Sequence, residues 1–269
     1  MIFQKLYAFL RRDFFEKSSY KFNFISSVAG IFISTATFFF IAKLIPGENI
    51  SSLVPYGGGY FSFVIIGIAF SGILGMFQEG LPDIIRNAQM TGTLEAILVT
   101  RTSISTVLIG SSFFNFLMSF IRTIFHLGIA IFVFGMTLGN IHWIGAIIVF
   151  VLTVMCFLSI GILSTSFILV YKLGNPFSWI FGGLSGLFGG IFFPIEVLPG
   201  WLKWISYLLP ITHSLRGLRL SLLSSVSFSQ IMPSIIVLAC FSLVLLPLSF
   251  VVFRVSILKA KKDGTLTHY

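Results

Sequence analysis

The acidic residues of this 269-residue chain are few, and they lie outside its long apolar segments. Carboxylates that relay protons or bind coupling ions inside a membrane normally lie within such segments, so this placement counts against a proton- or sodium-coupled mechanism. Glu79 lies at the end of an apolar segment, so it is the one acidic residue that still allows an ion-coupled mechanism. All eight acidic residues lie in or beside polar connections: Asp13, Glu16, Glu48, Glu79, Asp83, Glu95, Glu196 and Asp263.

Motifs for nucleotide, metal or nucleophilic chemistry are missing from the sequence. The chain has neither Gly-x-x-x-x-Gly-Lys-Ser/Thr, which cradles phosphates, nor His-Glu-x-x-His, which binds zinc. We therefore predict that the chain is not itself an enzyme, that it has no catalytic, cofactor-binding or metal-binding residue, and that any energy source lies elsewhere.

Arg122 and His126 form the exceptional polar pair, one helical turn apart within the apolar segment 104–134. A charged residue inside a bilayer costs about 2.5–3.5 kcal/mol on insertion scales, so it is rarely accidental. One interpretation is a polar patch on a substrate path that contacts an anionic head group. The other, favoured because intramembrane polar residues commonly join helices, is a bundle-facing arginine that hydrogen-bonds carbonyls or a neighbouring helix.

The overall composition explains why these residues must be considered in a membrane. The chain is 57% hydrophobic, 16% aromatic and only 9% charged, whereas a soluble domain carries about 25% charged residues. This excludes a soluble domain, a disordered chain, a disulfide scaffold and a nucleic-acid-binding module. We therefore attribute the excess of 17 Lys and Arg over eight acidic residues to membrane topology, and we expect no nucleic-acid partner.

Six apolar stretches are long enough to cross a hydrocarbon core of about 30 Å, which needs about 20 residues. Only helices satisfy every backbone group internally at this length, and no alternating pattern suggests a barrel. The sequence thus predicts an all-α integral membrane protein with one transmembrane domain over 1–269, and with spans at about 22–45, 57–78, 104–134, 143–170, 177–195 and 231–254.

The basic residues and the N-terminal segment predict the orientation. Most of the Lys and Arg residues fall on one side when both termini are cytoplasmic, as the positive-inside rule requires. Within 1–21, Phe3, Leu6, Leu10 and Phe14 follow a helical period. This pattern predicts an amphipathic helix in the cytoplasmic interface, near anionic lipids. Such a helix is either a plain membrane anchor or also part of a docking surface for a partner.

Two further segments carry structural signals. Gly182, Gly186 and Gly190 form overlapping small-xxx-small units in the fifth span, which favour close approach of another helix. After that span, prolines interrupt 195–219 and aromatic residues suit the bilayer interface, so we expect a re-entrant or interfacial hairpin on the outer side. Arg216 and Arg219 would then face lipid phosphates or an anionic substrate, or serve as ordinary interfacial anchors.

The polar connection 79–103 is the longest predicted cytoplasmic segment. Thr93 can cap a short helix whose first turn contains Glu95, an acidic residue that the helix dipole favours there. That helix would place Leu94 and two later apolar residues on one side, which the membrane surface or a soluble partner could bury.

The same segment carries a family resemblance. Gly92-Thr93-Leu94-Glu95, with Thr100-Arg101-Thr102-Ser103, resembles the cytoplasmic signature of the ABC transporter type 2 permeases, although Arg101 stands where the family often has proline. A second signature after the fifth span is similar to Phe193-Pro194, Leu198-Pro199-Gly200-Trp201, Leu209-Pro210 and Gly217-Leu218-Arg219. The likeness covers nearly the whole chain.

The resemblance implies a permease subunit of an ATP-driven exporter in the cytoplasmic membrane. Its partners would be cytoplasmic ABC ATPase subunits, which carry ATP and Mg, a second identical or related permease, and membrane lipids. Its substrate would be an amphiphile such as a drug, a lipid or a lipid-linked glycan. On this analogy the ATPase-coupling residues are Gly92, Thr93, Leu94, Glu95 and Arg86, with Arg11 and Arg12 alongside.

The resemblance also implies that the first and fifth spans line the interface between two permeases, which would give Gly182, Gly186 and Gly190 a partner. ATP-driven closure of the ATPases would pull on 79–103 and rock the bundle. The competing hypothesis is a stand-alone channel, a lipid scramblase or an accessory subunit, because the residues alone exclude neither passive conduction nor a structural role.

Overall fold

The computed structural model describes residues 11–15, 21–45, 51–57, 59–92, 104–171 and 176–262. Every regular element in these residues is a helix. A helical segment covers 11–15. The others are α2 (Lys21–Leu44), η1 (Ser51–Tyr56), α3 (Tyr60–Gly75), η2 (Met76–Gly80), α4 (Leu81–Met90), α6 (Ile104–Phe132), α7 (Trp143–Tyr171), α8 (Pro176–Phe188), η3 (Ile195–Val197), α9 (Gly200–Tyr207), α10 (Pro210–Leu223) and α11 (Phe228–Lys262).

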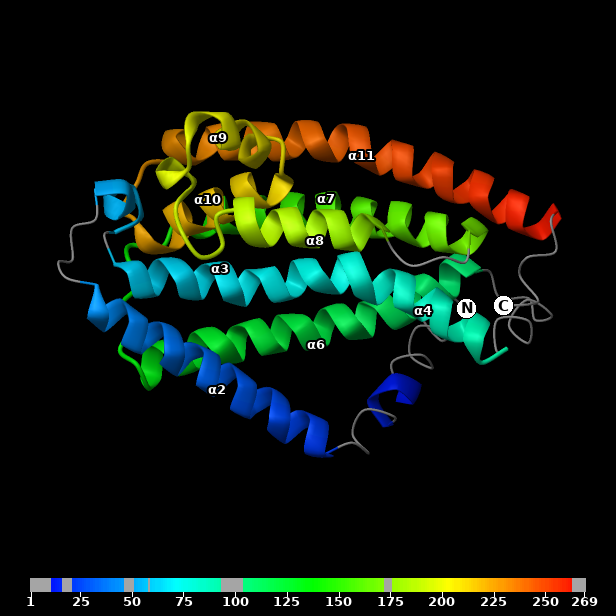
Figure 1. Cartoon of the computed structure of the whole chain (residues 1–269), viewed down its shortest axis with the longest axis horizontal. Coiled ribbons are helices and arrows are strands. Elements are labelled where there is room, and N and C mark those ends of the chain that lie inside the picture. The colour runs from blue at the N-terminus through cyan, green and yellow to red at the C-terminus, as the bar shows by residue number, and fades with distance from the viewer. Residues whose placement is uncertain are drawn as a thin grey trace.

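The long helices run lengthwise, with the short helices η1, α9 and α10 gathered at one end (Figure 1). Five segments are long and apolar enough to cross a membrane: Ile25–Leu44, Tyr60–Met90, Val107–Phe132, Trp143–Tyr171 and Phe228–Ala260. The predicted span at 177–195 differs, because its helix α8 has 13 residues and ends at Phe188. Thirteen residues rise about 20 Å, which is less than the thickness of the hydrocarbon core.

Helix α7 forms the centre of the bundle and packs against α11, α10, α4 and η2. It is apolar on all sides: one side packs against other helices and buries Val149, Cys156, Phe157 and Leu169, and the other exposes apolar residues such as Ile147. Gly161 permits a close contact at one point. A Cβ there would lie 2.3 Å from the Phe77 carbonyl oxygen, so η2 can approach the α7 backbone only because residue 161 has no side chain.

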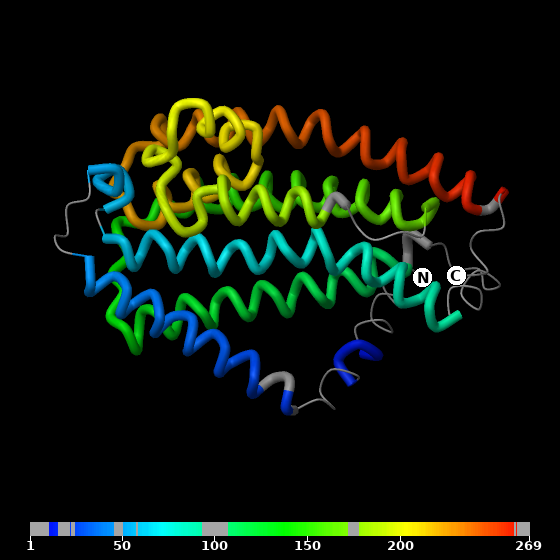
Figure 2. The backbone as a smooth tube through the Cα atoms, in the orientation of Figure 1, coloured from blue at the N-terminus to red at the C-terminus, as the bar shows by residue number. Residues whose placement is uncertain are grey.

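Helix α2 lies at the margin of the bundle. Its C-terminal end is near α3 and α6, and it diverges from them toward its N-terminal end (Figure 2). Aromatic contacts join its C-terminal half to α3 and to the turn after α6, with ring centroids 5.4 Å apart for Phe39 and Phe61 and 5.1 Å apart for Phe39 and Phe134. Only 6% of its apolar window is buried, and Ile33 and Phe40 are more than half exposed, so the outward side of α2 is available to lipid or to another chain.

The second span is longer than predicted. The predicted span ends at 78, with a polar connection from 79, but α3, η2 and α4 form one continuous helical stretch from Tyr60 to Met90. Pro82 lies within this stretch, in the first turn of α4, and it has no N–H to donate to the preceding turn. The π-turn of η2 precedes it, and the Gln78 carbonyl, four residues before Pro82, accepts a hydrogen bond from the Ser178 hydroxyl. The neighbouring helix α8 therefore satisfies the carbonyl that a proline cannot.

Candidate functional site

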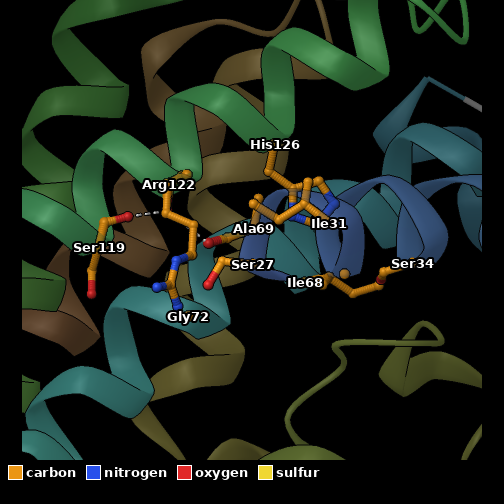
Figure 3. Close-up of a pocket in the computed structure, with 11 residues that line it drawn as sticks. Ser27, Ile31, Ser34, Ile68, Ala69, Gly72, Ser119, Arg122 and His126 are labelled. Carbon is orange, nitrogen blue, oxygen red and sulfur yellow. Dashed lines mark hydrogen bonds between the residues drawn. The ribbon is translucent and has the colours of Figure 1, made fainter. Parts of the chain in front are cut away.

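A cleft of about 290 Å³ that contains an arginine and a histidine lies between α2, α3 and α6 (Figure 3). Residues 119, 122, 123 and 126 share one face of α6, because positions three and four apart lie above one another on a helix. The same spacing brings one face of α2 and one face of α3 to the cleft. The lining residues are Ser27, Gly30, Ile31 and Ser34 from α2, Ile68, Ala69 and Gly72 from α3, and Ser119, Arg122, Thr123 and His126 from α6.

Small residues on α2 and α3 create the space. Gly30 and Gly72 both line the cleft, and a Cβ at either position would meet nothing within 4 Å. Thr123 fixes the opposite wall, since its hydroxyl donates a hydrogen bond to the Ala69 carbonyl of α3 over 2.9 Å and lies 3.0 Å from the Ser119 carbonyl. The cleft is therefore bounded by a joined pair, α3 and α6, and by the divergent helix α2.

Arg122 and His126 come together in this cleft, as their spacing on one helix predicts. Figure 3 shows the Arg122 side chain extending toward Ser27 and Gly72, and the His126 ring beside Ile31. Arg122 is exposed, and within the described residues its guanidinium makes no hydrogen bond and has no carboxylate partner. His126 is only 6% exposed, and its Nε2 atom is buried without a hydrogen-bond partner.

Arg219 occupies a different environment from the one predicted. It was predicted on the outer side, facing lipid phosphates or an anionic substrate or serving as an interfacial anchor, whereas it is 3% exposed inside the bundle. Its guanidinium donates hydrogen bonds to three backbone carbonyls, those of Phe63 (3.0 Å), Gly190 (2.7 Å) and Ile191 (3.0 Å). It also lies 3.4 Å from the centroid of the Phe63 ring, within cation–π distance.

The sequence contained a signal for this burial. Arg219 follows Ile211 and Leu215 at helical spacing, so it falls on the apolar face of α10, and both of those residues are buried. Arg216 lies on another face and is exposed. Arg219 thus joins α10 and α3 to the non-helical backbone after α8.

The predicted glycine face of the fifth span is only partly helical. Gly182 and Gly186 lie on α8, and a Cβ at Gly186 would meet nothing within 4 Å. Gly190 lies beyond the end of α8 and has φ +75°, a left-handed conformation that glycine adopts without strain. It therefore belongs to the turn that Arg219 holds, and the second small-xxx-small unit does not form on a helix.

The predicted ATPase-coupling residues are described in part. Gly92 follows α4 with φ +68°, Arg86 is half-buried on α4, and Thr93, Leu94 and Glu95 lie outside the described residues. Arg11 and Arg12 are exposed on the helical segment 11–15. Arg12 pairs with Asp13 at 2.6 Å and donates a hydrogen bond to the Ser111 hydroxyl of α6 over 3.1 Å, so this segment contacts the bundle.

Comparison with known proteins identifies the family. The chain matches the family model described as ABC-2 type transporter over residues 4–223, which includes both segments that carry the predicted signatures. No curated protein matches the chain in a separate comparison. The family match covers most of the sequence, and five long apolar helices fit a multi-pass membrane protein. The chain therefore belongs to the ABC-2 type transporter family, as a membrane-spanning permease subunit of an ABC transporter.

Proposed function

We propose that this chain exports an amphiphile across the cytoplasmic membrane, driven by ATP hydrolysis on separate ABC ATPase subunits. The observation that carries the proposal is the uninterrupted helical stretch from Tyr60 to Met90. It begins beside the outer short helices and ends immediately before Gly92-Thr93-Leu94-Glu95, the segment that resembles the family's cytoplasmic signature. A continuous helix transmits a displacement at one end to the other.

The contacts of this helix support a route by which such a displacement would reach the bundle. Its middle section, η2, packs against Gly161 of the central helix α7, and Gln78 is linked to Ser178 of α8. A force on the 92–95 segment would therefore act on α7 and α8 together. The π-turn of η2 is the point at which the stretch departs from regular α-helix, and π-turns are frequent at functional sites.

The proposed topology has six crossings with both termini cytoplasmic, and α8 forms the short fifth one. Non-helical backbone at membrane depth is tolerated only where protein satisfies its polar groups. The turn after α8 meets this requirement, because Arg219 binds the carbonyls of Gly190 and Ile191. The helices α9 and α10 then form the outer re-entrant segment, with Trp201 and Trp204 exposed for an interface. At the other end of the chain, segment 1–21 lies in the cytoplasmic interface.

The proposed transporter contains two permeases, identical or related. The outward side of helix α2 is exposed, and Gly186, which lies on α8 with Gly182, leaves room for a neighbouring backbone because a Cβ there meets nothing within 4 Å. These surfaces are the proposed contact with the second permease. The substrate is an amphiphile of the drug, lipid or lipid-linked glycan kind, which can enter from the membrane beside α2.

Purification of the tagged chain from its native membranes in gentle detergent tests this proposal. We expect an ABC ATPase with Walker motifs to co-purify, and Glu95→Ala to abolish transport-linked ATP hydrolysis. Glu48→Ala removes the same side chain from the predicted outer side and should leave hydrolysis unchanged. Recovery of the chain with membrane proteins only, in several gentle detergents, would refute the proposal and favour a channel or scramblase, for which substrate flux without ATP is the next measurement.

A further inference from the structure

We propose that the cleft between α2, α3 and α6 binds the phosphate-bearing head group of an anionic amphiphile, with Arg122 and His126 as its ligands. We also infer that this amphiphile is the transported substrate. That assignment rests on the proposed function, whereas the binding of the head group does not.

The charge balance of the cleft indicates an anion. Arg122 contributes a permanent positive charge, and none of the residues that line the cleft is acidic. Arg122 lies ten residues before the end of α6, about 15 Å along the helix axis, which is near the middle of a hydrocarbon core of about 30 Å. An arginine at that depth without a counter-charge is costly, so an anion in the cleft would stabilise it.

His126 supplies an independent observation. Its side chain is more than nine-tenths buried, its Nε2 atom has no hydrogen-bond partner, and it lines the same cleft one turn from Arg122. Buried polar atoms are almost always hydrogen-bonded, so an orphaned ring nitrogen beside an unpaired guanidinium points to a missing ligand. The hydroxyls of Ser27, Ser34 and Ser119 line the same space and can donate hydrogen bonds to phosphate oxygens.

The surroundings of the cleft favour an amphiphile over a free anion. On α6, the residues beside Arg122 and Thr123 are Ile121, Ile124 and Phe125, which are all exposed. On α2, Ile25 and Ile33 flank the cleft residues and are 63% and 64% exposed. An acidic head group in the cleft would therefore leave its acyl chains against apolar side chains. A guanidinium and a phosphate also form paired, charge-assisted hydrogen bonds.

Binding of phosphatidylglycerol to the purified full-length chain tests the proposal, with phosphatidylcholine of the same acyl chains as the zwitterionic comparison. Retained lipid is counted by native mass spectrometry over a range of lipid concentrations. We expect preferential retention of phosphatidylglycerol, and about tenfold weaker retention after Arg122→Gln, which removes charge-assisted hydrogen bonds. Arg254→Gln is the matched control, because it removes an exposed arginine charge from α11 and should leave retention unchanged.

A second pair of variants tests the cleft without altering charge. Gly30→Leu fills the cleft from a position where a Cβ meets nothing within 4 Å, so the fold should tolerate it and phosphatidylglycerol should be excluded. Gly128→Leu is its control, since Gly128 is equally unobstructed on α6 and does not line the cleft. Equal retention of the two lipids, or unchanged retention in both Arg122→Gln and Gly30→Leu, would overturn the proposal.

Two further arms identify the source of the anion. Inorganic phosphate that displaces phosphatidylglycerol at comparable concentration would overturn the amphiphile assignment and make the ligand a free anion. In the complex with its ATPase, release of the lipid on ATP addition supports a substrate, whereas full retention through turnover overturns that part and makes it a resident lipid. Lipid retention and its displacement by phosphate are measured without the ATPase, so a failure of the binding proposal is distinguishable from a failure of the proposed function.

Discussion

Replacing Arg219 with methionine should destabilise the bundle more than any other single loss of charge in α10. Arg219→Met keeps a long side chain but removes every donor from a site that is 3% exposed. The Gly190 and Ile191 carbonyls, in non-helical backbone, lose the hydrogen bonds that Arg219 donates. The Phe63 carbonyl also loses one, but it still accepts a backbone hydrogen bond within helix α3. Each unsatisfied buried carbonyl costs about 1–3 kcal/mol, so we expect a loss of about 2–6 kcal/mol.

Thermal unfolding in detergent measures this loss. For a chain of this size, 1 kcal/mol corresponds to about 2–4 °C in the midpoint, so Arg219→Met should unfold about 6–12 °C below the wild type for a loss of about 3 kcal/mol. Unfolding of a large membrane protein is commonly irreversible, so all variants are compared at one heating rate. Intrinsic fluorescence reports the transition, since Trp201 and Trp204 lie on α9, which packs against α10.

Arg216→Met is the matched control, because Arg216 lies three residues earlier on α10 and is exposed. Its loss should change stability by less than about 0.5 kcal/mol and the midpoint by less than about 2 °C. Arg219→Lys should fall between the two, since an ammonium group keeps the charge but lacks the planar fork that binds separate carbonyls. Equal midpoints for the wild type and Arg219→Met would refute the assigned role of this residue.

Three further predictions concern packing, pH and assembly. Gly161→Ala should cost about 1–3 kcal/mol in a melting experiment, because its Cβ would lie 2.3 Å from the Phe77 carbonyl oxygen, whereas Gly183→Ala, which meets nothing within 4 Å, should be neutral. Burial raises the pKa of Tyr56 to about 12. Its neutral form therefore adds stability that is intact below pH 10 and is lost as the pH rises through 12, so Tyr56→Phe should flatten the decline in unfolding midpoint over that window; parallel declines would count against it. Gly186→Leu should lower the dimer fraction in light scattering without changing the melting of the protomer, and an unaltered dimer would remove α8 from the contact between permeases.

Much of the helical framework follows from the sequence. The predicted spans 104–134 and 143–170 correspond to α6 (Ile104–Phe132) and α7 (Trp143–Tyr171) within two residues at each end. The breaks at Pro199 and Pro210 were also predictable, and each proline stands at the start of a short helix. These features depend on the hydrophobicity and the backbone conformational preferences of consecutive residues. Both are local properties, so they can be read from the sequence without knowledge of tertiary contacts.

Other features required contacts between distant segments. The helix through Pro82 continues because Ser178, far away in the sequence, binds the carbonyl that proline leaves free. Arg219 is buried for a similar reason, since carbonyls from α3 and from the turn after α8 converge on it. A prediction that treats each arginine or proline separately does not include hydrogen-bond partners from distant segments.

For the candidate cleft, too, the sequence determines one part and the tertiary structure the other. The sequence alone places Arg122 and His126 on one face of one apolar helix, because their separation is one helical turn. It does not determine what that face meets. In the tertiary structure, small residues of α2 and α3 lie opposite the pair, and α2 diverges from the bundle. The two polar side chains therefore line a cleft and, within the described residues, do not join two helices. Periodicity is a local property of the chain, whereas a cavity depends on the volumes of side chains that only folding brings together.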